Sequence, residues 1–186
     1  MTKQQLSVYP ENLFEVVEAD LNCAGERVWW VVYTKSRQEK VFSRQLAAKQ
    51  VPHYLPLVRK TYLSRGRKFT SHVPLFPGYV FMFGSEQERI LSLTTNRISR
   101  ILEVANPARL RAELEQVNRL IMIGAPLTVE QRLLPGDRVR IRHGAMAGLE
   151  GTVLVRRGKT RLIVAVTLLQ QGVSVEVDDF SLEPID

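Results

Sequence analysis

The chain has 186 residues, of which 45% are hydrophobic and 24% charged, and its formal net charge is +7. This composition is typical of a globular protein with one medium or two small domains. No run approaches the roughly 18 consecutive apolar residues that a membrane helix needs, and residues 1–27 lack the basic start and apolar core of an export signal. Cys23 is the single cysteine, which excludes an intramolecular disulfide and a cysteine zinc site. We therefore expect a cytoplasmic protein with no membrane segment.

The positive charge is concentrated in the middle of the chain. Residues 28–124 hold sixteen Lys and Arg against six Asp and Glu, whereas residues 1–27 hold two against five. A segment this basic commonly binds a polyanion, because contacts with phosphates release condensed counterions. The alternative is a solvated basic surface that has no ligand.

The first two thirds of the chain alternate between strand-like and helix-like segments. Residues 1–27 are polar, and we expect a weakly structured extension in which 13–17 could form a docking turn or short helix. Residues 29–33 are aromatic and β-branched, as in a buried strand. Ser36 and Glu39 have the spacing of a capping box for a helix that ends near Gln50. Further strands are expected at 54–62, 69–73, 79–83 and 98–104, and further helices at 86–93 and 107–123. This order predicts an α+β domain with a mainly antiparallel sheet over residues 28–123.

The last third has a different pattern. Residues 124–134 carry Pro126 and little periodicity, so we expect a linker there. Residues 135–186 contain about five short alternating segments separated by turns, which is the pattern of a small closed β-barrel.

The start of this last part is rich in glycine. Sharp turns and close approaches between backbones in a very short barrel favour glycine, and apolar residues flank these positions. The segment 135–153 resembles a KOW motif, which implies an SH3-like barrel. The structural residues of this motif are Val139, Ile141, Gly144, Gly148, Gly151 and Val153.

Two blocks carry a more specific resemblance. Residues 29–40 are Trp-Trp-Val-Val-Tyr-Thr-Lys-Ser-Arg-Gln-Glu-Lys, and residues 74–81 are Pro-Leu-Phe-Pro-Gly-Tyr-Val-Phe. Both resemble the N-terminal domain of the NusG family of transcription elongation factors, and with the KOW-like part the resemblance covers residues 28–186. In that family the N-terminal domain binds the clamp helices of the largest RNA polymerase subunit through an apolar concavity. The resemblance implies a polymerase site at the matching positions, which are Tyr33, Phe76, Pro77, Tyr79, Phe81 and Ile101.

The aromatic content of residues 76–83 agrees with that implication. Four aromatic residues exceed what one face of a small sheet needs, and Tyr or Phe on a rigid strand suits an interface hot spot. Pro77 and Gly78 bend the chain, so we predict that Phe76 and Tyr79 are accessible to a partner. Val80 and Met82 are predicted to be core.

Basic residues at two places form a candidate nucleic-acid surface. Short Lys and Arg clusters without stacking aromatics contact the phosphate backbone and do not select a base sequence. The resemblance places this surface near DNA at the transcription bubble. Lys35, Arg37, Lys40 and Arg44 follow the first strand, and Arg65, Arg67 and Lys68 lie at an expected hairpin tip.

Residues 167–177 differ from the pattern of housekeeping members of the family. The hairpin tip and residues 74–81 are more similar to specialised paralogues of the RfaH and UpxY type, which act as antiterminators on particular operons. The resemblance implies a monomer whose C-terminal domain recruits a ribosomal protein or another partner.

An enzyme is not expected. His53, His72 and His143 lack metal-ligand spacing and a nucleophile–base arrangement, and no phosphate-binding glycine loop precedes a helix. We therefore expect no metal and no cofactor. The alternative function is a KOW-containing RNA-binding or ribosome-associated protein without a polymerase contact. Residues 29–40 and 76–83 favour the NusG interpretation, because an RNA-binding module needs neither block.

Overall fold

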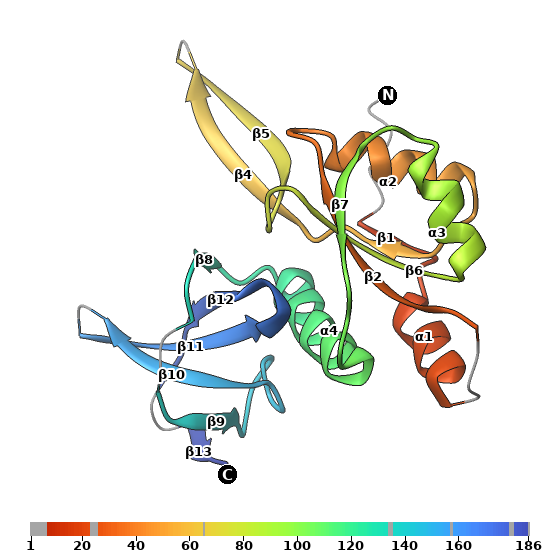
Figure 1. The fold of residues 1–186 in the computed structure, drawn as a ribbon. Coiled ribbons are helices and arrows are strands. Elements are labelled where there is room, and N and C mark those ends of the chain that lie inside the picture. Colours follow the sequence, from red (N-terminus) through yellow and green to blue (C-terminus); the bar gives the residue numbers. More distant parts are fainter. Residues whose placement is uncertain are drawn as a thin grey trace. The chain divides into compact units, whose positions relative to one another are not determined.

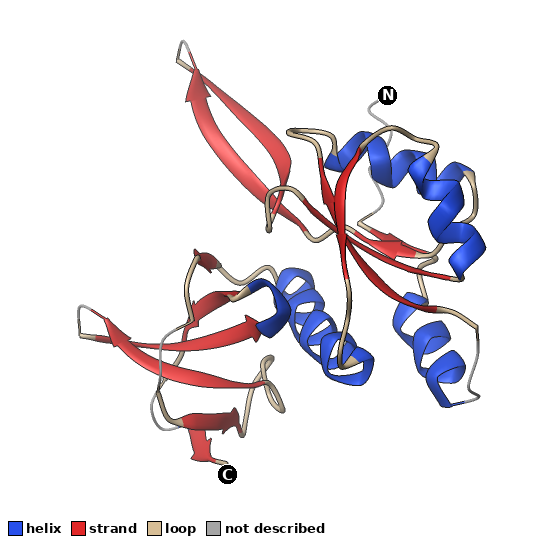
Figure 2. Cartoon of the chain, viewed as in Figure 1, coloured by secondary structure: helices blue, strands red, loops and turns tan. Residues whose placement is uncertain are grey.

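The computed structural model describes residues 7–22, 26–64, 66–133, 136–156, 158–178 and 181–185. The chain divides into two compact units, Met1–Pro107 and Ala108–Asp186. Helices and antiparallel sheets occur together (Figures 1 and 2), so the predicted α+β class is confirmed at that level. None of the described helices is both long and apolar enough to cross a membrane.

The first unit is built on a five-stranded antiparallel sheet with the order β1-β3-β6-β2-β7. Its two long central strands pair in a register that places Tyr33 opposite Tyr79. The strands are β1 (Val8–Tyr9), β2 (Val28–Thr34), β3 (His53–Tyr54), β6 (Tyr79–Gly84) and β7 (Ile98–Leu102).

Helices cover both faces of this sheet. Since side chains alternate along a strand, Val32 and Met82 point to one face, where they pack with Phe42 of helix α2 (Glu39–Ala48). Helix α3 (Glu86–Leu93) lies on the same side of the sheet (Figure 1). Helix α1 (Leu13–Asn22) covers the other face, where the ring of Phe14 meets the edge of Tyr54 at 5.5 Å.

Residues 7–22 are therefore an integral part of the unit, and the expectation of a weakly structured extension is wrong for them. β1 pairs with β3 at the edge of the sheet. Leu13 and Val17 of α1 are fully buried. The short apolar pattern at 13–17 is the buried face of a ten-residue helix.

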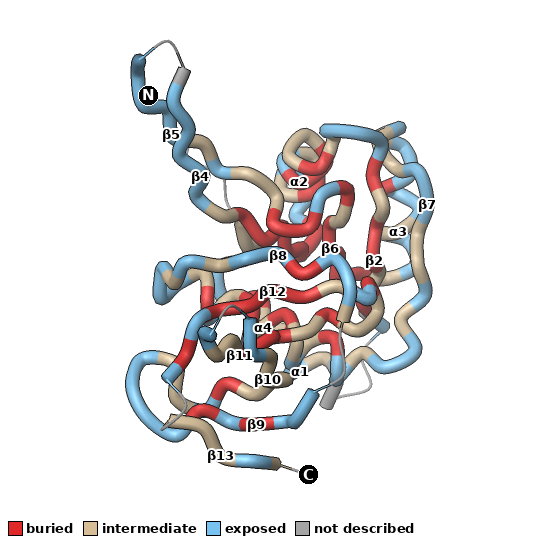
Figure 3. Tube along the Cα trace, turned by 90° about the vertical axis from the view of Figure 1, so that its left-hand side faces the viewer, coloured by how far each residue is buried: buried red, intermediate tan, exposed pale blue. Residues whose placement is uncertain are grey.

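Strands β4 (Leu57–Ser64) and β5 (Arg67–Pro74) form a separate two-stranded antiparallel sheet. The hairpin extends away from the five-stranded sheet (Figure 1), and most of its length is exposed (Figure 3). β4 ends at Ser64 and β5 begins at Arg67, so both strands reach closer to the hairpin tip than the expected strands 54–62 and 69–73.

Helix α2 begins at Glu39, and its N-cap residue Gln38 makes no capping hydrogen bond through its side chain. The capping box expected between Ser36 and Glu39 is therefore wrong. The capping box that the structure does contain starts α3, where Ser85 and Glu88 bond reciprocally to each other's backbone amides.

The second unit holds a six-stranded antiparallel sheet with the order β13-β9-β10-β11-β12-β8. The β-rich C-terminal part agrees with the sequence, but the described strands number six where about five were expected. The additional one, β8, falls within the expected linker and pairs with β12. The strands are β8 (Thr128–Glu130), β9 (Arg138–Ile141), β10 (Glu150–Arg156), β11 (Lys159–Val166), β12 (Gln171–Glu176) and β13 (Leu182–Pro184), with a 3-10 turn η1 at Thr167–Leu169.

Helix α4 (Pro107–Ile123) is bonded to this second sheet, although the sequence placed it with the first domain. The Glu113 carboxylate accepts hydrogen bonds from the amide and hydroxyl of Thr167 at 2.9 and 2.6 Å. Gln116 accepts from the Glu150 amide at 2.6 Å. The compact units thus divide at Pro107, whereas the sequence predicts a linker at residues 124–134.

Candidate functional site

A row of three side chains crosses adjacent strands on one face of the first sheet. Tyr79 of β6 lies opposite Tyr33 of β2, and Tyr33 lies opposite Arg100 of β7. The two tyrosine rings are 5.0 Å apart between centroids, and the Arg100 guanidinium lies 5.2 Å from the Tyr33 centroid. Both tyrosines are half-buried and Arg100 is exposed. We call these three residues the tyrosine row.

The turn before β6 holds the row in place. Glu39 of α2 accepts a hydrogen bond from the Gly78 amide at 2.7 Å, and the Gly78 carbonyl accepts from the Thr34 amide at 2.8 Å. Gly78 has a φ of +88°, and a Cβ there would lie 2.6 Å from the Tyr33 ring. A side chain at position 78 is therefore excluded both by the backbone conformation and by the ring. Pro77, beside it, is exposed.

Two of the predicted polymerase-binding residues are buried. Phe76 and Phe81 have no exposed surface and pack edge to face with their centroids 6.4 Å apart. The prediction that Phe76 is accessible is wrong, because the bend at Pro77 and Gly78 directs its ring inward against Phe81. Val80 and Met82 are buried, as expected.

Ile101 is also separated from the row. It pairs with Val32 on β2, so it faces the side of the sheet that α2 covers, and it packs against the core there. Alternation along β7 puts Arg100 on the face of the row instead. Arg100 was not predicted as a site residue, although its place one residue before Ile101 is the signal that could have identified it.

The basic residues after β2 surround the turn into α2. Lys35, Arg37 and Arg44 are exposed and Lys40 is half-buried. Lys35 donates to the side-chain oxygen of Asn96 at 2.7 Å. These four residues share one region of the unit, and we call them the turn cluster.

The hairpin carries exposed basic and aromatic residues beyond those predicted from the sequence. Arg67 and Lys68 are exposed near the tip, and Arg65 lies outside the described residues. Arg59 and Lys60 of β4 are exposed as well and were missed. The hairpin also holds an exposed stacked pair, Tyr62 and Phe69, so the assumption that its basic residues lack stacking aromatics is wrong.

The residues of the KOW-like segment lie in the second unit. Val139 and Ile141 of β9 are buried and Val153 is half-buried. Gly144 and Gly148 have positive φ in the turn between β9 and β10. Gly151 lies where a Cβ would come within 2.3 Å of the Ile163 carbonyl oxygen, so the two backbones pass too closely for any side chain.

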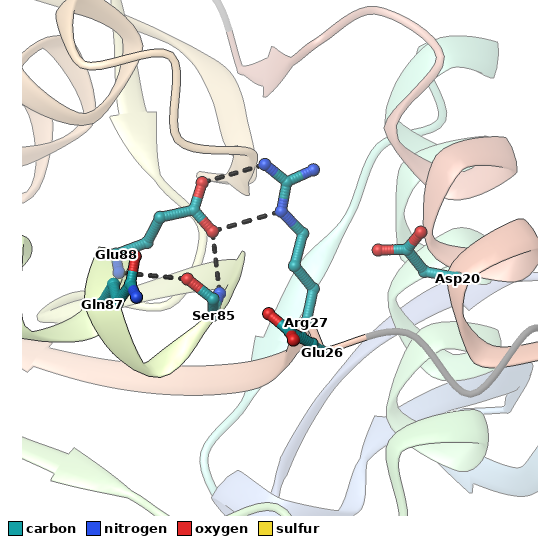
Figure 4. Close-up of a pocket in the computed structure, with 6 residues that line it drawn as sticks. All are labelled: Asp20, Glu26, Arg27, Ser85, Gln87 and Glu88. Carbon is teal, nitrogen blue, oxygen red and sulfur yellow. Dashed lines mark hydrogen bonds and ion pairs between the residues drawn. The ribbon is translucent and has the colours of Figure 1, made fainter.

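A polar hollow lies beside the start of α3, lined by Asp20, Glu26, Arg27, Ser85, Gln87 and Glu88 (Figure 4). Arg27 donates two hydrogen bonds to the Glu88 carboxylate, at 3.1 and 3.0 Å. Burial alone would raise the pKa of Glu88, but the bonds from Arg27 and from the Ser85 amide hold that pKa below its ordinary value. The charged groups of Arg27 and Glu88 thus bond to each other, and Glu88 also accepts from the amide of the N-cap residue Ser85. No group of three or more His, Cys, Asp or Glu among the described residues could hold a metal.

Residues 27–121 match the family model of NusG, described as transcription termination factor nusG. This match spans just over half of the chain and contains the tyrosine row, the turn cluster and the hairpin. The chain belongs to the NusG family.

A solved structure titled as an MjSpt4:Spt5 complex in conformation B is also similar to this NusG-family chain. The two are 15% identical, and the likeness covers 85% of this chain and 97% of that one with a TM-score of 0.27. A TM-score this low carries no argument about either unit. No curated protein sequence matches the chain.

Proposed function

We propose that this NusG-family protein is a non-enzymatic, cytoplasmic transcription elongation factor that binds RNA polymerase through the tyrosine row and modulates pausing or termination. Membership of the family supports a role in transcription. The observation that carries the polymerase contact is the half-buried Tyr33–Tyr79 pair beside exposed Arg100 and Pro77. Tyrosine and arginine are enriched among residues that dominate binding energy.

The tyrosine row is suited to a protein interface because it is rigid before binding. Each tyrosine sits on a central strand, and the turn before Tyr79 is held from both sides by Glu39 and Thr34. Little side-chain freedom is left to lose on association, and that loss is a main cost of binding. The resemblance to the family makes the clamp helices of the largest polymerase subunit the partner.

We also propose roles for the basic surfaces of the first unit and for the second unit. The turn cluster and the hairpin contact DNA near the transcription bubble, mainly through its backbone. The second unit is a KOW-type module that recruits a further partner, such as a ribosomal protein. The differences at residues 167–177 support a specialised role of the RfaH or UpxY type over a housekeeping one.

Capture of core RNA polymerase by the immobilised chain, with and without nuclease, tests the proposal. Replacing Tyr79 and Arg100 by alanine should each weaken capture roughly 30-fold if each contributes about 2 kcal/mol. In the nuclease-treated arm Tyr62→Ala is a matched control, because it removes an exposed tyrosine outside the row. Capture that is lost on nuclease treatment would favour the alternative, an RNA-binding protein without a polymerase contact.

A further inference from the structure

The two faces of the β4–β5 hairpin differ in chemistry. Tyr62 pairs with Phe69 across the strands, and their rings stack with centroids 5.8 Å apart and an interplanar angle of 18°. Alternation places Lys60 and Arg67 on the same face, one on each side of the aromatic pair along the ribbon. The opposite face carries Thr61, whose hydroxyl lies 3.5 Å from that of Thr70.

The aromatic pair is exposed to solvent. Tyr62 is 49% exposed and Phe69 is 45% exposed, so each ring uses one side for its partner and leaves much of the other surface to solvent. Residues 57–74 contain five Lys and Arg and no Asp or Glu. The resulting positive charge repels cationic ligands and attracts anionic ones.

We propose that this face of the hairpin binds single-stranded nucleic acid, with an unpaired base stacking on the Tyr62–Phe69 pair and neighbouring phosphates contacting Lys60 and Arg67. Aromatic rings between basic side chains are the combination that single-strand-binding proteins use, because every base has a π-face. A duplex offers its phosphates but keeps its bases stacked inside, so it engages the charges and not the rings. The inference deepens the nucleic-acid part of the proposed function and rests on it.

Binding of the full chain to a single-stranded DNA of about 12 nucleotides containing 2-aminopurine tests the inference, because that base changes its fluorescence on stacking. Tyr62→Ala together with Phe69→Ala should weaken affinity about 5- to 150-fold, which is the range for losing one base–aromatic stack. The 2-aminopurine signal should disappear, while the dependence of affinity on salt stays the same. Tyr62→Phe alone, which keeps an aromatic ring at this position, should retain both the affinity and the 2-aminopurine signal of the natural chain.

Neighbouring residues supply matched controls. Thr61→Ala together with Thr70→Ala changes the next register pair on the opposite face and should leave binding unchanged. Lys60→Gln should reduce the salt slope by about 0.7, as for one single-strand phosphate contact, and Arg59→Gln, of equal charge but on the other face, should reduce it less. Duplex DNA of the same sequence should bind the aromatic variant and the natural chain equally.

Three results would overturn the proposal. The first is unchanged single-strand affinity in the aromatic variant, and the second is an equal loss in the threonine control. The third is a loss of nuclease-resistant polymerase capture in the aromatic variant without any loss of DNA binding, which would make the face a protein contact. Tyr79→Ala should leave DNA binding intact, so failure of the polymerase proposal and failure of this one give different patterns.

Discussion

The carboxylate of Glu39 accepts a hydrogen bond from the amide of Gly78 at 2.7 Å, in a place where both residues are buried. The bond joins the first residue of α2 to the turn that precedes β6, across 39 positions of sequence. Tyr79 follows directly, so the position of half of the tyrosine pair depends on a contact made by the opposite face of the sheet.

Replacing Glu39 by alanine should therefore lower the free energy of unfolding by about 1–3 kcal/mol, because it leaves the buried Gly78 amide without its acceptor. Glu39→Gln keeps an acceptor oxygen and should lose less. Urea unfolding of the two variants measures the difference. A Glu39→Ala protein as stable as the natural chain would show that this bond does not hold the turn.

Phe76 and Tyr79 should respond differently to truncation. Phe76→Ala removes a fully buried ring and should destabilise the chain by about 3–5 kcal/mol. Tyr79→Ala removes a half-buried ring and should cost less stability while weakening polymerase capture. Thermal melting of both variants decides between these roles, and a Phe76→Ala protein that melts normally would return Phe76 to the candidate interface.

Acidification should destabilise the first unit through His53. This side chain is buried between the Ser43 hydroxyl, 2.7 Å from Nε2, and the Val51 carbonyl, 2.9 Å from Nδ1. Burial lowers the pKa of His53 from 6.5 to about 4. Between these two values the unfolded chain takes up a proton that the folded chain does not, so stability is full above about pH 6.5 and is lost as the pH falls toward 4.

The loss at pH 5 should be about 2 kcal/mol relative to pH 7.5, from the difference between the two pKa values of His53. Urea unfolding at both pH values measures it. His53→Gln is the control, since it cannot titrate and should flatten the pH dependence in this window. An equally steep dependence in that variant would assign the effect to other groups.

Glu130 should matter to the stability of the second unit although the sequence placed it in a linker. It is 7% exposed, and its carboxylate accepts from the Ser174 hydroxyl at 2.6 Å and from Arg156 at 3.5 Å. Glu130→Ala should lower the free energy of unfolding by about 1–3 kcal/mol, because the buried Ser174 hydroxyl loses its acceptor. The neighbouring Thr128→Ala, at an exposed position, is the comparison. If the Glu130→Ala protein were as stable as the Thr128→Ala protein, Glu130 would contribute no more to stability than an exposed linker residue.

Local pattern predicted most elements of the first unit, because periodicity and turn chemistry act over a few residues. The order of strands and helices from β2 to β7 follows the apolar alternation of segments such as 29–33 and 79–83. β1 and β8 were missed because they are two and three residues long and have no periodicity to detect. They form by pairing with strands distant in sequence, which no local signal encodes.

The candidate site was predicted less well because exposure depends on tertiary packing. Phe76 and Tyr79 are both aromatic, yet the Phe76 ring packs against the buried Phe81 and the Tyr79 ring against the half-buried Tyr33. Glu39 has the spacing of a capping residue after Ser36, but its carboxylate bonds to Gly78 instead. For Tyr79 and Glu39 the deciding partners, Tyr33 and Gly78, lie far away along the chain, where a local motif does not show them.

The hairpin has a further consequence that concerns association between copies of the chain. β4 and β5 pair only with each other among the described strands, so both outer edges of an eight-residue ribbon keep backbone groups available to another strand. Lysine and arginine on such a ribbon repel an identical ribbon and thereby oppose edge-to-edge aggregation. The same positive charges that attract a polyanion thus also oppose pairing between copies of the hairpin, and neutralising all of them at once should leave both edges prone to aggregation.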